Sequence, residues 1–148
     1  MRPSALSLLI AYLAFLGGCG DPPLYQTPLP YGYAQWSNGG EFGHIVKQES
    51  ATSGRPVAPL GKGPSGREQW CNDFGWHGQW VVGEVIEYAD RAFVHPPLSK
   101  RYLILDTANE QVTYYGSRTE ALAAWGKLTN APFPQLTREH ASRTRLLP

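Results

Sequence analysis

Alternating apolar and polar positions are clearest in the second half of the chain, where they predict a β-hairpin. Two β-favouring runs, residues 101–106 and 111–115, are separated by four residues suited to a turn. Leu103 and Leu105 share one face of the first run, because side chains alternate along a strand. We therefore expect an antiparallel hairpin with one buried face.

A short helix is predicted directly after this hairpin. Ser117 and Glu120 have the spacing of a capping box, in which the hydroxyl caps the first turn and the carboxylate reaches back. Apolar residues then follow on one side of the helix: Ala121, Leu122, Trp125 and Leu128. The expected fold class is α+β, a small antiparallel sheet with a hairpin followed by one short packed helix.

The residues before the hairpin predict one more strand and an aromatic loop. Residues 80–88 are rich in Val, Ile, Trp and Tyr, and Gly83 marks a bulge or a close contact within this strand. Trp70, Trp76 and Trp80 fall within eleven residues that also contain two glycines and an Asn-Asp pair. Because glycine and Asn-Asp favour turns, we interpret residues 70–80 as a loop that leads into the strand.

The first half of the chain shows neither the two-residue hydrophobic period of a strand nor the 3.6-residue period of a helix over any long stretch. Residues 20–66 contain seven prolines and nine glycines, which predicts a tether that cannot bury enough apolar surface to order itself. Its five aromatic residues exceed what a spacer needs, so part of residues 24–45 is also a candidate to pack on the folded body or a partner. The expected divisions are a signal peptide over 1–18, a lipidated start and Pro/Gly-rich linker over 19–66, a small α+β domain over 67–130, and an irregular polar tail over 131–148.

The amino-terminal residues have the three parts of an export signal. Arg2 is followed by an apolar run of about a dozen residues, which is too short to span a bilayer, and then by small residues. The order Leu16-Gly17-Gly18-Cys19 resembles the lipobox of bacterial lipoproteins. This resemblance implies that the signal is cut before Cys19, that Cys19 receives a diacylglyceryl thioether, and that its new amino group is acylated, for example with palmitate.

The same resemblance implies a membrane location. Two or three acyl chains hold a protein on a bilayer essentially permanently. In bacteria with two membranes, an Asp after the lipidated cysteine usually retains a lipoprotein on the inner membrane. Gly20 occupies that position and Asp21 comes one residue later. The periplasmic face of the outer membrane is therefore the expected location within the cell envelope.

Composition narrows the choice of partners. Without Arg2 the mature chain has equal numbers of basic and acidic residues, so no long-range field favours nucleic acid. Lipidation consumes Cys19 and leaves Cys71 as the only thiol, which we expect to be buried as a small hydrophobic side chain.

Candidate chemistry is sparse. Cys71 and His77 could approach each other as a thiolate and imidazole pair, but no nucleophile motif surrounds them. The four histidines lack the spacing of a zinc site, and no cofactor is expected.

Residues 61–66 contain Lys and Ser among glycines but lack the strand and helix of a phosphate-binding loop, so we interpret them as linker. Four carboxylates are expected on solvated strand faces and in turns: Glu84, Glu87, Asp90 and Asp106.

These observations favour a non-enzymatic lipoprotein, anchored through Cys19, that binds another envelope protein. Two alternatives stay open. One is a carbohydrate or peptidoglycan binder that uses exposed aromatic rings, for which the candidate residues are Trp70, Trp76, Trp80 and His77. The other is an immunity or inhibitor lipoprotein, which a small tethered domain suits but no residue singles out.

Overall fold

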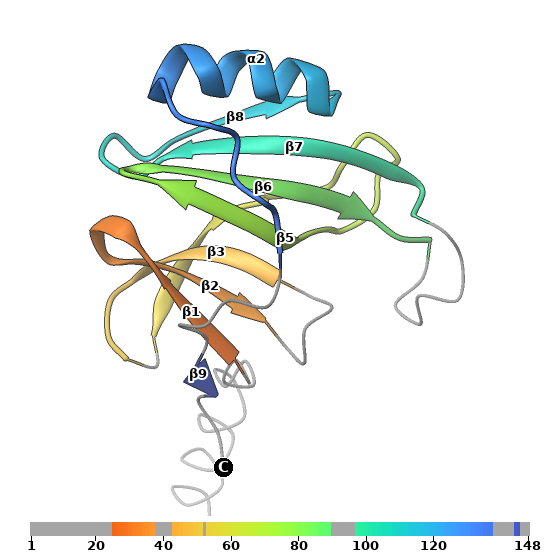
Figure 1. Ribbon diagram of the computed structural model, residues 1–148. Coiled ribbons are helices and arrows are strands. Elements are labelled where there is room, and N and C mark those ends of the chain that lie inside the picture. The colour runs from red at the N-terminus through yellow and green to blue at the C-terminus, as the bar shows by residue number, and fades with distance from the viewer. Residues whose placement is uncertain (1–24, 38–42, 52, 90–96, 138–143, 146–148) are drawn as a thin grey trace, which may run out of the picture.

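The computed structural model describes residues 25–37, 43–51, 53–89, 97–137 and 144–145, which form two antiparallel sheets and one α-helix (Figure 1). The first sheet has the order β4-β3-β2-β1-β9, with β1 (Tyr25–Leu29), β2 (Tyr33–Ser37), β3 (Gly43–Gln48), β4 (Gly54–Ala58) and β9 (Thr144–Arg145). The second sheet has the order β5-β6-β7-β8, with β5 (Gln69–His77), β6 (Trp80–Glu87), β7 (Ser99–Asp106) and β8 (Gln111–Tyr115). A 3-10 turn, η1 (Pro30–Gly32), joins β1 to β2, and the helix α2 (Arg118–Thr129) follows β8.

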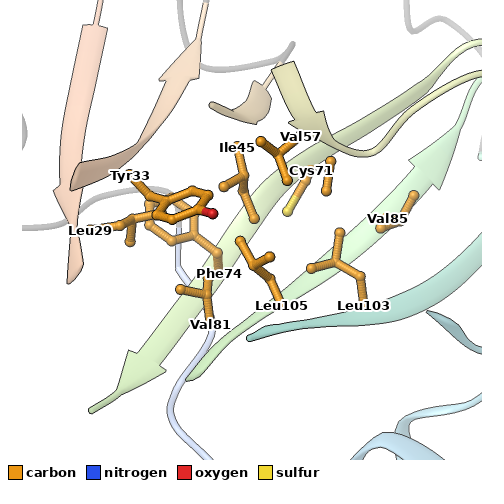
Figure 2. Packing of buried hydrophobic residues seen from close by; sticks show 11 residues of the cluster. Leu29, Tyr33, Ile45, Val57, Cys71, Phe74, Val81, Val85, Leu103 and Leu105 are labelled. Atoms are coloured by element: carbon orange, nitrogen blue, oxygen red, sulfur yellow. The ribbon is translucent and has the colours of Figure 1, made fainter. Parts of the chain in front are cut away.

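The two sheets face each other across the main hydrophobic core (Figure 1). Figure 2 shows Leu29, Tyr33 and Ile45 of the first sheet directed toward Phe74 and Leu105 of the second. All five side chains are at least nine-tenths buried. Alternation along each strand places these residues on the inner face of each sheet. Burial of these two apolar faces against each other stabilises the face-to-face arrangement of the sheets.

The opposite face of the second sheet is covered by α2, which lies over β7 and β8 (Figure 1). Val82 and Ile104 are buried on this side together with Trp125 of the helix. Because the second sheet has a packed layer on both faces, consecutive rather than alternate residues are buried along β6 (81–83 and 85–87) and β7 (102–106).

The predicted α+β class is confirmed, with a hairpin followed by one short packed helix. β7 and β8 are the predicted hairpin, and β6 matches the strand predicted over residues 80–88. Leu103 and Leu105 share the face that points into the main core. Among the described residues, no helix is long and apolar enough to cross a membrane.

The prediction of a linker over residues 19–66 is wrong for the part of that segment that the structure describes. Residues 25–58 supply four strands, and their inward side chains fill half of the main core. The prolines lie where strand pairing tolerates them: Pro56 is on the edge strand β4, and Pro28 lies beyond the two β1 residues that pair with β9. Tyr33 of this segment is buried in the main core, as the alternative interpretation expected, whereas Tyr31 is 61% exposed and Phe42 lies outside the described residues.

The carboxyl-terminal residues are irregular in part, but they do not form a free tail. The backbones of Phe74 and Thr137 exchange two hydrogen bonds of 3.2 Å, and the Trp125 indole donates to the carbonyl of Pro132 at 3.1 Å. Further along, β9 pairs with β1. Residues 131–137 therefore cross the edge of the second sheet, and residues 144–145 lie at the edge of the first.

The aromatic segment that the sequence assigned to a loop is the strand β5. Trp and Phe favour strands, and the Asn-Asp pair is accommodated by a break in register between Cys71 and Asp73. Gly75 is needed for close packing rather than for a turn, since a Cβ there would lie 2.9 Å from the Cβ of Pro134. Gly78, with a φ of 56°, provides the turn from β5 to β6.

The helix differs from its prediction in which side chains it buries. Ala121 and Trp125 are buried, whereas Leu122 and Leu128 are 46% and 42% exposed. The backbone N–H of Glu120 donates to the Ser117 hydroxyl at 3.2 Å, so the predicted cap is present.

Candidate functional site: a groove at Trp70

The three tryptophans proposed as binding residues do not form one platform. Trp70 lies near the start of β5, whereas Trp76 and Trp80 lie at the opposite end of the β5–β6 hairpin, roughly 20 Å along the strand. Trp76 stacks on Phe74 with ring centroids 6.2 Å apart and packs against the main core. Trp80 packs against the cluster under α2, and His77 is exposed at the end of β5.

Trp70 lines a hollow surface, which we call the Trp70 groove. It consists of two hollows that share Trp70 and Glu68 in their walls, with volumes of about 340 Å³ and 220 Å³. The larger hollow is lined by Lys62, Gly66, Arg67, Glu68, Trp70, Tyr88 and Ala89. The smaller hollow is lined by His44, Pro56, Pro59, Leu60, Gly61, Glu68, Gln69 and Trp70.

His44 of β3 fixes one edge of the Trp70 ring. The two ring centroids are 5.0 Å apart and the ring planes are inclined at 73°, an edge-to-face contact. Burial lowers the pKa of His44, and this effect exceeds the opposing influence of Glu68. His44 is therefore neutral at pH 7 and can both donate and accept a hydrogen bond in the smaller hollow.

One wall of the groove is a tight turn formed by residues 62–68. The N–H of Gly63 donates to the carbonyl of Arg67 at 2.8 Å, and the N–H of Gly66 donates to that of Gly63 at 2.9 Å. Lys62 and Glu68 pair as an isolated antiparallel bridge. The glycine, lysine and serine segment that the sequence assigned to a linker is thus a folded turn.

The buried carboxylate of Glu87 fastens this turn to the second sheet. It accepts hydrogen bonds from the N–H and the hydroxyl of Ser65, at 3.2 and 2.9 Å, and from the hydroxyl of Ser99. Gly63 packs directly against it, and a Cβ at that position would overlap the carboxylate. The prediction of a solvated Glu87 is wrong, because the side chain is 1% exposed.

Several hydrogen bonds keep Glu87 ionised despite its burial. Desolvation alone would raise its pKa, but the donors from Ser99 and Ser65 and the nearby charge of Arg101 together hold the pKa below its ordinary value. A carboxylate that accepts three hydrogen bonds stabilises the turn more than a neutral acceptor would.

Gln69 fastens the other end of the same loop. Its amide nitrogen donates to the carbonyls of Leu60 and Gly61 at 3.4 Å, and its oxygen accepts from Arg101, whose Nε lies 3.1 Å away. The guanidinium of Arg101 in turn covers the ring of Tyr114 at 4.2 Å. The segment from Leu60 to Gln69 is therefore held at its start by Gln69 and in its middle by Glu87, both side chains of the second sheet.

The proposed pairing of Cys71 with His77 does not occur. Cys71 is fully buried, as expected for a small hydrophobic side chain, and burial raises the pKa of its thiol, followed in size by the effects of Asp73 and Glu84. His77 lies six residues further along one extended strand and is exposed. This thiol lacks the access and the ionisation that a nucleophile needs.

Metal ligation gains no support from the described part of the chain, where no group of three or more His, Cys, Asp or Glu side chains could hold an ion. Cys19, Asp90, His95 and His140 lie outside the described residues. Comparison with protein-family models, with curated proteins and with solved structures gives no match to this chain.

Sequence reasoning found Trp70 but missed the residues that surround it. Glu87 and Gln69 give one recoverable signal, because each is a polar residue at a core-facing position of a strand. His44 gives none, since its proximity to Trp70 depends on how the two sheets pack. Lys62 reaches the groove through the turn over residues 62–68, which the sequence assigned to a linker.

Proposed function

We propose that this protein is a lipid-anchored, non-enzymatic binding protein of the bacterial cell envelope. The observation that carries the proposal is the order Leu16-Gly17-Gly18-Cys19 at the end of an export signal. An outer-membrane location follows from Gly20 at the sorting position and is part of the same proposal.

Binding is favoured over catalysis by the state of the side chains that could react. The thiol of Cys71 is buried and its pKa is raised, while the carboxylates of Glu87 and Asp106 are occupied by structural hydrogen bonds. The Trp70 groove, in contrast, combines an aromatic ring with basic and acidic side chains on a fixed turn.

The observed fold removes one reason to expect a protein partner. A core limited to residues 67–130 would be marginal on its own and would gain from a partner that covers it. The strands over residues 25–58 already supply that cover, so stability gives no reason to expect a partner protein. The groove therefore carries more weight than the core in choosing the ligand.

The anchor is tested by the intact mass of the protein extracted from membranes, with fragmentation of its amino-terminal peptide. We expect an acylated Cys19 as the first residue, and we expect Cys19→Ser to release the protein from the membrane fraction. A free thiol at Cys19 in a correctly exported protein would overturn the anchor.

Binding is tested separately by cross-linking in intact cells from a photoreactive residue placed at Ala89, which lines the larger hollow. We expect cross-linked envelope material that disappears when Trp70 is changed to Ala. The matched control places the same residue at Lys127, which is exposed on α2 at the other side of the second sheet.

A further inference from the structure

We propose that the Trp70 groove binds a saccharide that carries a carboxylate group. The inference rests on the proposed function, because an anchored binding protein would meet the acidic glycans of the envelope. Three features of the groove support it: its aromatic lining, its local charge and its rigidity.

The aromatic lining suits a sugar ring. Trp70 is half-buried and lines both hollows, and Tyr88 lines the larger one with it. Flat aromatic faces bind the apolar C–H face of a pyranose, while their polar edges tolerate water. The larger hollow has a volume of about 340 Å³, which lies within the range typical of small-ligand sites, about 300–1,000 Å³.

The charge of the groove favours an anionic sugar. Lys62 and Arg67 lie in the wall of the larger hollow with Glu68, which leaves one excess positive charge beside Trp70. A guanidinium binds a carboxylate with two parallel hydrogen bonds. Since the mature chain is neutral as a whole, this excess is a local property of the groove rather than a general one.

The turn that carries these charges is rigid before any ligand arrives. Glu87 holds Ser65 in its middle, and Gln69 holds the carbonyls of Leu60 and Gly61 at its start. A preorganised wall loses little conformational entropy on binding, so weak polar contacts can contribute to affinity. Neutral His44 adds a hydrogen-bonding group to the smaller hollow without cancelling the excess charge.

The test uses two disaccharides that differ mainly in one carboxylate. Titration calorimetry on the detergent-solubilised full-length mature protein compares N-acetylglucosaminyl-N-acetylmuramic acid with N,N′-diacetylchitobiose, which lacks the lactyl carboxylate. We expect the acidic disaccharide to bind about twofold to fivefold more tightly, the effect typical of an exposed charge pair.

Three variants separate the contributions. Trp70→Ala should lower the affinity for both disaccharides by up to about tenfold, and Trp70→Phe should retain most of that affinity. Arg67→Gln should equalise the two affinities, whereas Lys127→Gln, which removes one positive charge far from the groove, should leave the preference unchanged. Unfolding curves for each variant establish that the fold is intact.

Each outcome bears on one claim. Equal affinity of the wild-type protein for both disaccharides overturns the preference for a carboxylate, and binding of neither at millimolar concentration overturns the saccharide site. Cross-linking from Ala89 to a protein, with no glycan attached, also overturns the saccharide site. None of these results affects the anchor, which is decided by the mass of the amino-terminal peptide.

Discussion

Single contacts explain several residue choices, and the clearest is the pair formed by Gly83 and Cys71. The two residues lie on the neighbouring strands β6 and β5, and a Cβ on Gly83 would overlap the Sγ of Cys71. We expect Gly83→Ala to lower the free energy of unfolding by about 1–3 kcal/mol, because an overpacked core shifts side chains and backbone. Chemical denaturation measures this change.

A double-mutant cycle provides the control for this contact. Cys71→Ala removes the overlapping sulfur, so the double variant should be more stable than the sum of the two single effects predicts. Strict additivity would show that the overlap is relieved elsewhere. Gly126→Ala is a matched glycine change in α2 with nothing within 4 Å, and it should stabilise the protein by up to about 1 kcal/mol.

Glu87 makes stability depend on pH at the acidic end. Its pKa is lower in the folded protein than in the unfolded chain, so its stabilising effect is present above the ordinary pKa and lost as pH falls below it. We expect Glu87→Gln to cost about 1.5–3 kcal/mol at pH 7. The difference from wild type should shrink below about pH 4.5, which urea unfolding at a series of pH values measures. A constant difference would contradict an ionised Glu87.

At the scale of single elements, the cap of α2 gives a direct prediction. The Ser117 hydroxyl accepts the N–H of Glu120, and the Glu120 carboxylate accepts the N–H of Gly116 at 3.0 Å. Ser117→Ala should therefore cost about 1 kcal/mol, as measured by thermal unfolding. Thr119→Ala, an exposed change in the same turn with no role in the cap, should cost less.

The sequence predicts the elements whose contacts are local along the chain and misses those whose contacts join distant segments. The β7–β8 hairpin and the capped helix are local, and their alternation, turn and capping residues all indicate the same structure. The strands over residues 25–58 pair and pack with segments far along the chain, and their prolines and glycines outweigh short apolar runs in any local analysis. The sequence indicates Trp70 as a candidate aromatic binding residue. It does not indicate that Trp70 and Trp76 lie far apart, because that separation depends on β5 being an extended strand and not a loop.

At the scale of the whole molecule, the final residues complete the packing of both sheets. A chain that ends after Asn130 loses Phe133 and Leu136 from the cluster under α2, and also the pairing of Phe74 with Thr137. We expect it to lose about 3 kcal/mol or more and to self-associate through the uncovered edge of β5. Light scattering and denaturation measure both. A chain that ends after Thr137 keeps these contacts and loses only the pairing of β9 with β1, so it should recover most of the lost stability and keep the edge of β5 covered.

The proposed lipid anchor and the fold together predict an orientation on the membrane. Only five residues lie between Cys19 and Tyr25, so the start of β1 would lie at most about 20 Å from Cys19 if that residue is lipidated as proposed. β9 and the start of β1 lie at the opposite end of the molecule from α2 (Figure 1). The first sheet should therefore face the bilayer, with α2 roughly 20 Å farther away.

Energy transfer to acceptor lipids measures this orientation. A fluorophore on Pro28→Cys, in β1, should transfer more efficiently than one on Lys127→Cys, in α2. Inserting about thirty Gly and Ser residues between Gly20 and Asp21 should erase the difference, because the body can then rotate freely. Equal transfer without the insertion would contradict the orientation.

The pairing of β9 with β1 also has a consequence for the order of events during synthesis. Among the described residues, the first strand, β1, has the last one, β9, as its neighbour, so the first sheet lacks one edge until residues 144–145 are available. Strands β1–β4 of that sheet supply about half of the main core. If the proposed export signal operates, this sheet would stay incomplete until nearly the whole chain has crossed the membrane, so the chain would remain easier to unfold during translocation.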